Sequence, residues 1–298
     1  MSQFRADRLN GLHTAIFTPL DLHGEFKPEH YPALLAFQRN AGTDGVAVCG
    51  TNGEGVSLSI NERKLALETA IRHRETLTII AGTGATSVVD AVDLTRHAAA
   101  SGADAALVLP PFFFKAPSAQ GLADYFRSIM DSADIPVLLY NIPQFTAVPI
   151  TDELLKLLAD HPNLAGIKDS AGDWNRTLDL ITRYPRLKIF TGSDRLLADG
   201  YTHGAAGCIS GGANAFPEVL AAVRNAYFAD PTGDGARAEQ VRFDKLIDIT
   251  IKYPFISSTK SIIANRGLPR LGVRPPLTIL SQEKEQELIG ELRAANFL

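Results

Sequence analysis

A lysine that ends an apolar segment is the residue of this sequence best placed for covalent chemistry. Lys168 follows Leu-Ala-Gly-Ile (164–167), a run typical of a buried strand. An apolar environment disfavours an ammonium ion and favours the free amine, which can attack a carbonyl and form a Schiff base. Two other interpretations stay open here: an ion pair with a nearby carboxylate such as Asp169, or a side chain that reaches solvent at the rim.

A tyrosine ends the preceding apolar segment. Tyr140 opens the sequence Tyr-Asn-Ile-Pro (140–143). Neighbouring strands lie about 4.8 Å apart, so side chains at the ends of two strands can meet in one pocket. A phenol beside an amine can transfer protons. The alternative is a core tyrosine whose hydroxyl is satisfied by a neighbour.

A glycine-rich segment, 50–55, follows another apolar run. It reads Gly-Thr-Asn-Gly-Glu-Gly, so its backbone N–H groups could hold an anion, with the side chains of Thr51 and Asn52 beside Gly50. The alternative is a tight turn whose glycines supply positive φ angles. The glycine spacing does not match a dinucleotide-binding fingerprint or a P-loop.

Small and polar residues end the last two apolar segments. They are Ser193 and Asp194 in one segment and Ile209 and Ser210 in the other, and they would suit a hydroxylated ligand. The alternative is a set of tight turns and helix caps, with Asp194 capping a helix that begins at Arg195.

Several classes of protein are excluded by composition. The formal charge of −4 gives no basic surface for nucleic acid. Seven histidines without ligand spacing predict no metal, and two cysteines make neither a disulfide framework nor a zinc site. Charges in residues 1–13 argue against a signal peptide, and no window approaches the ~20 apolar residues of a membrane span. We therefore expect a soluble cytoplasmic protein.

The elements that must position these residues alternate between short apolar runs and amphipathic segments. Helices are expected at 61–75, 87–102 and 151–162, the last capped by Thr151. The expected strands are 13–20, 45–50, 77–84, 105–113, 136–143, 164–170, 187–194 and 207–214. This is sustained βαβ spacing, which predicts an α/β fold of the (β/α)8 TIM barrel type, with the candidate residues at the carboxyl ends of its strands. A doubly wound open sheet is the alternative.

After residue 214 the pattern becomes helical only. We expect the barrel to occupy residues 1–226 and a C-terminal helical extension to occupy 227–298, with a hinge loop at 231–235.

Four motifs in order resemble those of the dihydrodipicolinate synthase / N-acetylneuraminate lyase family. They are Gly-Thr-Asn-Gly-Glu (50–54), Tyr-Asn-Ile-Pro (140–143), Gly-Ile-Lys-Asp (166–169) and Gly-Ser-Asp (192–194). The resemblance covers nearly the whole chain, including Gly-Val-Arg-Pro-Pro (272–276) near its end.

The resemblance implies a class I aldolase that uses pyruvate or another 2-oxo acid and needs no cofactor and no metal. It implies that Lys168 forms the Schiff base and that Tyr140 is the general acid and base. It implies that Thr51 and Asn52 belong to the loop that holds the substrate carboxylate. It also implies a homo-oligomer, a tetramer built as a dimer of dimers.

Two departures from the synthase branch bear on the substrate. That branch carries an arginine for the carboxylate of aspartate semialdehyde where this chain has Phe145, and a phenyl ring cannot replace a charge-assisted bidentate contact. It also carries a tyrosine after strand four, where this chain has Phe112-Phe113-Phe114. We therefore expect cleavage of a 2-keto-3-deoxy sugar acid to pyruvate and an aldehyde, with hydroxyl contacts from Ser193, Asp194 and Ser210. The alternatives are dihydrodipicolinate synthase activity, dehydration of a deoxy sugar acid, and a non-catalytic ligand-binding homologue.

Overall fold

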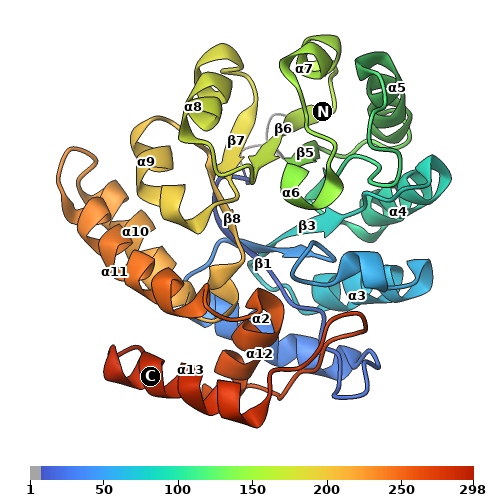
Figure 1. Ribbon diagram of the computed structural model, residues 1–298. Coiled ribbons are helices and arrows are strands. Elements are labelled where there is room, and N and C mark those ends of the chain that lie inside the picture. The colour runs from blue at the N-terminus through green and yellow to red at the C-terminus, as the bar shows by residue number, and fades with distance from the viewer. Residues whose placement is uncertain (1–7) are drawn as a thin grey trace.

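Eight parallel strands close into a barrel in the computed structural model, which describes residues 8–298 (Figure 1). The strands are β1 (Gly11–Ala15), β2 (Gly45–Val48), β3 (Thr78–Gly82), β4 (Ala105–Val108), β5 (Val137–Asn141), β6 (Leu164–Asp169), β7 (Lys188–Thr191) and β8 (Gly207–Ser210). β1 pairs with β8, which completes the ring and rules out the open sheet. The predicted (β/α)8 barrel is confirmed. Residues 1–7 of the charged opening segment lie outside the described residues.

Each strand is shorter than the apolar segment that predicted it. The segment 13–20, for example, contributes three residues to β1 and then continues as a buried loop. Apolar residues persist beyond the strands because the loops at the mouth of the barrel are themselves covered by helices and by the C-terminal extension. The loops that carry the candidate residues therefore begin earlier than expected.

The helices surround the barrel and connect its strands. They are α2 (Tyr31–Asn40), α3 (Ile60–Arg72), α4 (Val88–Ser101), α5 (Ala119–Met130), α6 (Pro143–Thr146), α7 (Asp152–Leu158), α8 (Trp174–Arg183), α9 (Leu197–Thr202) and α10 (Pro217–Ala229). The three predicted helices correspond to α3, α4 and α7. Thr151 caps α7 as predicted, because its hydroxyl accepts a hydrogen bond from the Leu154 N–H.

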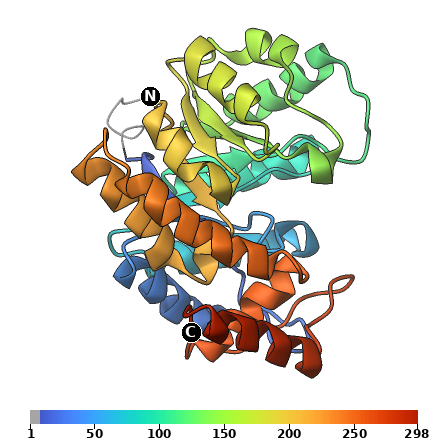
Figure 2. The same ribbon diagram turned by 60° about the vertical axis from the view of Figure 1, so that its left-hand side comes forward.

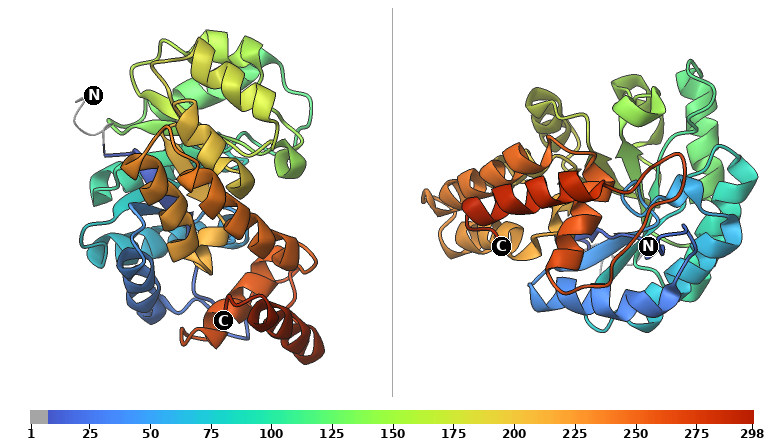
Figure 3. Two further views of the ribbon diagram at one scale, coloured as in Figure 1. Left: turned by 90° about the vertical axis from the view of Figure 1, so that its left-hand side faces the viewer. Right: turned by 60° about the horizontal axis from the view of Figure 1, so that its bottom comes forward.

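Three more helices follow: α11 (Gly235–Thr250), α12 (Phe255–Asn265) and α13 (Gln282–Ala294). Figures 2 and 3 show these orange and red helices together on one side of the barrel, with α11 alongside α10. The proposed boundary at residue 226 lies within α10, and the chain reverses at residues 230–234, where the hinge loop is expected. The division into two units stays a prediction.

Two apolar clusters make the core. A larger one fills the space between the outside of the barrel and the helices, and it contains the buried Cys49. A smaller one fills the inside of the barrel and includes Leu107, Tyr140, Phe190 and Ile209. Among residues 8–298, no helix has the length and apolar character needed to cross a membrane.

Candidate active site

Lys168 and Tyr140 are directly opposite each other in the register of β5 and β6. Both are buried, with 4% and 3% of their surface exposed, and the Lys168 Nζ lies 4.3 Å from the centre of the Tyr140 ring. The π face of a phenol attracts a cation at this distance. The two strand ends thus bring an amine and a phenol into contact, as the sequence predicts.

Asp169 does not pair with Lys168. Its Oδ1 accepts a hydrogen bond of 2.5 Å from the Asn141 amide, and its Oδ2 accepts one of 3.2 Å from the Thr177 hydroxyl. The Arg176 Nε lies 3.6 Å from Oδ1. Since successive residues of a strand point to opposite faces, Asp169 faces the helices while Lys168 faces the barrel interior. An ion pair with Asp169 and a side chain that reaches solvent therefore do not explain the position of Lys168.

The glycine-rich segment 50–55 approaches the same two residues. The Thr51 hydroxyl lies 3.2 Å from the Tyr140 hydroxyl, within hydrogen-bond distance. Asn52 is buried, and among the described residues its Nδ2 has no hydrogen-bond partner. An unused donor in a buried position carries a free-energy cost unless a ligand accepts from it. Thr51 and Asn52 can therefore offer polar groups to an anion beside Lys168.

A cavity of about 780 Å³ at the mouth of the barrel joins most of the candidate residues. Its walls include Thr51, Asn52, Tyr140, Lys168, Ser193 and Asp194. Gly50 does not line this cavity; it borders a smaller apolar cavity of about 260 Å³, which shares Thr51 and Tyr140 with the first. Tyr140 and Thr51 therefore lie between the two cavities, whereas Lys168 lines only the larger one.

Asp194 is held from the β8 side of the cavity. Its Oδ2 accepts a hydrogen bond of 2.8 Å from the Gly212 N–H, and its side chain does not cap the short helix Asp194–Leu196. Burial raises the pKa of the Asp194 carboxyl, while hydrogen bonds from Ser210 and Gly212 and the charge of Lys168 oppose that rise. The alternative interpretation of Asp194 as a helix cap is therefore excluded.

Ile209 and Ser210 are not part of the wall of the larger cavity, and their predicted contacts with a ligand stay a prediction. Ile209 points into the barrel interior and belongs to the inner apolar cluster. Ser210, the next residue, is fully buried outside the cavity lining, where its hydroxyl accepts from the Ala213 N–H and contacts Asp194. In the structure, the Ser210 side chain contacts Asp194.

Sequence reasoning missed several residues of the cavity wall. Ser170 follows Asp169, lines the cavity, and has a buried hydroxyl without a hydrogen-bond partner among the described residues. Gly192 lies against it: a Cβ at Gly192 would be 1.8 Å from the Ser170 Oγ, so only glycine fits. Ser170 is the polar residue directly after β6, and a polar residue at the end of a barrel strand is a sequence signal for the cavity wall.

The C-terminal extension also lines the cavity. The contributing residues lie between α11 and α13 and comprise Ile251, Pro254, Phe255, Ile256, Ser257 and Leu277. Helical segments far along the chain carry no strand-end signal, so the sequence does not predict that these residues line the cavity. The extension is part of the candidate site.

Four phenylalanines lie near the cavities. Phe145 lines both cavities and is 68% exposed, while Phe112 lines only the smaller one. Phe113 and Phe114 contact each other edge to face, with ring centres 5.3 Å apart, and about three quarters of each is exposed. Positions 112–114 are all phenylalanine, so none of them offers a hydroxyl group.

Among residues 8–298, no group of three or more His, Cys, Asp or Glu side chains is arranged to hold a metal ion. The polar chemistry available at the cavity therefore comes from an amine, a phenol, hydroxyls, amides and one carboxyl.

Comparisons with known proteins identify the family of this chain. The model of the dihydrodipicolinate synthetase family matches residues 8–295. An uncharacterized DapA-like lyase of Chloroflexus aurantiacus is 40% identical over 291 residues, which are 96% of this chain and 95% of the relative.

Two solved structures have the same fold. The dihydrodipicolinate synthase of Acinetobacter baumannii, complexed with pyruvate, is 30% identical with a TM-score of 0.91, and the match covers 97% of this chain and 100% of that one. A catalytic lysine mutant of the sialic acid aldolase of Ruminococcus gnavus is 28% identical with a TM-score of 0.90, covering 98% and 99%. The chain belongs to the dihydrodipicolinate synthetase family.

Proposed function

We propose that this protein is a class I aldolase in which Lys168 forms a Schiff base with pyruvate or another 2-oxo acid. The observation that supports this most directly is the contact of the buried Lys168 amine with the Tyr140 ring in a cavity. The amine adds to the C2 carbonyl, and loss of water leaves an iminium ion. No resident metal or cofactor takes part in the proposed reaction.

In the cleavage direction, the substrate is a 4-hydroxy-2-oxo acid. The electron pair of the C3–C4 bond moves into the iminium and leaves an enamine, while the C4 hydroxyl loses its proton and departs as an aldehyde. Protonation of C3 and hydrolysis then release pyruvate and the free amine. Tyr140, with Thr51 at 3.2 Å, is our candidate for the group that moves these protons.

Polar groups around Lys168 suggest how the substrate lies. Thr51 and Asn52 would receive the C1 carboxylate, since Asn52 offers an unused donor. Ser170, Ser193 and Asp194 lie in the cavity wall and would receive hydroxyl groups of the aldehyde half. We therefore propose a 2-keto-3-deoxy sugar acid as the substrate.

Dihydrodipicolinate synthase activity is the second candidate, because the Acinetobacter baumannii relative carries that name. The cavity argues against it: Phe145 is the residue at the position where the synthase branch uses arginine, and it leaves the semialdehyde carboxylate without a bidentate partner. Dehydration of a deoxy sugar acid keeps the same Schiff base and remains an outcome of the substrate test.

The chemical test is reduction with borohydride in the presence of pyruvate. Wild-type protein should gain the mass of one reduced pyruvate adduct, located on the peptide with Lys168, whereas Lys168→Met should gain none. Lys156→Met removes an exposed lysine from α7 and should react like wild type. An unmodified wild-type protein would refute the Schiff base. A coupled assay of pyruvate release from deoxy sugar acids, beside condensation with aspartate semialdehyde, identifies the substrate class.

We also propose a cytoplasmic homotetramer, built as a dimer of dimers. The exposed pair Phe113 and Phe114 stands next to the apolar cavity that Phe112 lines, and exposed aromatic clusters favour association. Sedimentation equilibrium should give four times the chain mass of 32.1 kDa. A monomer at micromolar concentration would contradict the proposal.

A further inference from the structure

Glu54 lies within the glycine-rich segment 50–55, in an unusual backbone conformation and a buried position. Its φ angle of 52° is left-handed, and only 2% of its surface is exposed. A left-handed non-glycine residue persists only where its surroundings hold it. Both carboxylate oxygens of Glu54 accept hydrogen bonds that keep the residue in this conformation.

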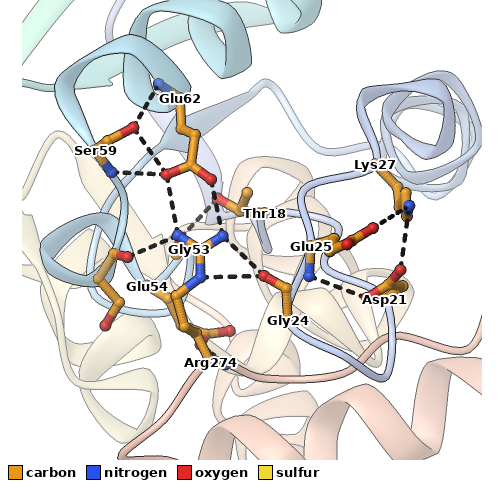
Figure 4. Close-up of polar contacts among 11 residues, drawn as sticks. Thr18, Asp21, Gly24, Glu25, Lys27, Gly53, Glu54, Ser59, Glu62 and Arg274 are labelled. Carbon is orange, nitrogen blue, oxygen red and sulfur yellow. Dashed lines mark hydrogen bonds and ion pairs between the residues drawn. The ribbon is translucent and has the colours of Figure 1, made fainter.

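Each oxygen of Glu54 is bound by the C-terminal extension. Oε1 accepts a hydrogen bond of 2.6 Å from the Lys260 ammonium on α12, and Oε2 accepts one of 2.9 Å from the Arg274 N–H. Lys260 is itself 1% exposed and also donates to the Gly272 carbonyl at 2.7 Å. Figure 4 shows Glu54 beside Arg274, whose guanidinium bridges Glu62 and the Gly24 carbonyl.

A buried ion pair of this kind is not explained by stability alone. Burial lowers the pKa of Lys260, and the charge of Glu54 opposes that shift. Replacing such a pair with apolar groups of similar volume is often neutral or stabilising, whereas removing one partner leaves an uncompensated charge. The role of the ion pair therefore depends on which residues it holds in place.

The geometry fixes the residues that face Lys168. The Glu54 N–H donates to the Thr51 carbonyl at 3.0 Å, and the Gly55 N–H donates to the Gly50 carbonyl at 3.1 Å. Thr51 in turn reaches the Tyr140 hydroxyl. A displacement of Glu54 would thus be transmitted through one hydrogen-bonded turn to Thr51 and Asn52.

We propose that Lys260 is a positioning residue for binding of the substrate carboxylate, acting through its ion pair with Glu54 on the conformation of Thr51 and Asn52. This inference rests on the proposed Schiff-base function and on the carboxylate role of the glycine-rich segment. It makes the C-terminal extension responsible for the affinity for pyruvate, although Lys260 touches no substrate.

The test measures borohydride trapping of the whole protein as a function of pyruvate concentration. In Lys260→Met, the pyruvate concentration that gives half-maximal trapping should rise at least tenfold, while the limiting rate at saturating pyruvate falls less. A residue that serves only the fold would lower the amount of folded protein and leave the half-saturating concentration of that fraction unchanged.

Two further variants complete the test. Lys252→Met breaks a half-exposed ion pair with Glu291 in the same extension and should keep the wild-type half-saturating concentration. The double variant Glu54→Gln with Lys260→Met removes both buried charges, so it should fold even where Lys260→Met does not, and it should still bind pyruvate weakly. Wild-type half-saturation in the folded double variant would overturn the proposal, and so would a double variant that cannot fold. Absence of trapping in the wild type would instead refute the Schiff base itself.

Discussion

Asn141 and Asp169 end adjacent strands and are joined by a hydrogen bond of 2.5 Å, one residue beyond Tyr140 and Lys168. The Asn141 amide also accepts from the Ile150 N–H at 3.0 Å, so it fastens the loop after β5 as well. The bond between the two strand ends supports the register of Tyr140 and Lys168 from the outer face of the barrel.

Replacing Asn141 with alanine should therefore destabilise the protein. The change leaves the buried Asp169 carboxylate short of one donor and the Ile150 N–H without its acceptor, at a cost of about 1–3 kcal/mol. Urea unfolding followed by circular dichroism measures it. Asn265→Ala, at the partly exposed end of α12, is the control and should cost less than about 0.5 kcal/mol. Equal midpoints for the two variants would contradict this account.

Tyr140→Phe should separate adduct formation from turnover. The ring still packs over Lys168, but the proton-transferring hydroxyl is gone, so turnover should fall by about 10²- to 10⁴-fold while some trapping by borohydride persists. Steady-state assay of pyruvate release measures the first quantity and mass spectrometry the second. Tyr184→Phe, which removes a part-buried hydroxyl bound to Asp152, should behave like wild type. Turnover within about threefold of wild type would remove Tyr140 from the proton path.

Phe145→Arg should strengthen an activity that we expect to be weak in the wild type. An arginine at the cavity rim would offer the semialdehyde carboxylate two charge-assisted hydrogen bonds, worth about 1.4 kcal/mol or more, which is a tenfold gain in kcat/KM for condensation with pyruvate. Val89→Arg, at a similarly exposed position on α4 outside the lining of either cavity, controls for the added charge. A wild-type protein that already condenses aspartate semialdehyde efficiently would show that Phe145 is no barrier.

The contact between Glu62 and Arg274 should make the free energy of unfolding depend on pH in the acidic range. Hydrogen bonds and the charge of Arg274 lower the pKa of Glu62 to about 2. The carboxylate therefore contributes stability that is present above its unfolded pKa of about 4.5, and that is lost as the pH falls through about 2.

Glu62→Gln should consequently lower the free energy of unfolding by about 1 kcal/mol at pH 7, a modest amount because the pair is partly exposed. The loss should become progressively smaller between pH 4.5 and pH 2, where the wild-type carboxylate itself becomes protonated. Urea unfolding at pH 7, 5 and 3 tests the trend. Glu153→Gln, exposed in the first turn of α7, should show no comparable dependence. A loss that grew as the pH fell would reverse the sign and contradict the assignment.

The sequence predicts the barrel and its reactive pair because the signals for both are local. Lys168 and Tyr140 each follow a run of apolar residues, and polar residues at strand ends of a barrel meet at one face. The position of Ser210 outside the cavity wall could not be predicted: both faces of its strand are buried, so the sequence has no alternation that shows which residues point inward.

The support of the glycine-rich segment could not be predicted for a different reason. Glu54 and Lys260 are 206 residues apart, and nothing in a single sequence links two charged residues at that separation. Likewise, Phe255 and Leu277 reach the cavity from helical and loop segments that look like ordinary surface elements in the sequence.

The dependence of Glu54 on Lys260 and Arg274 has a consequence for biosynthesis. All eight strands have been translated by residue 210, yet the anchors of Glu54 follow 50 to 64 residues later. On the ribosome, all eight strands can therefore emerge before the residues that hold Glu54. Under the proposed function, the turn that would receive the substrate carboxylate gains its support only after the extension has emerged and docked.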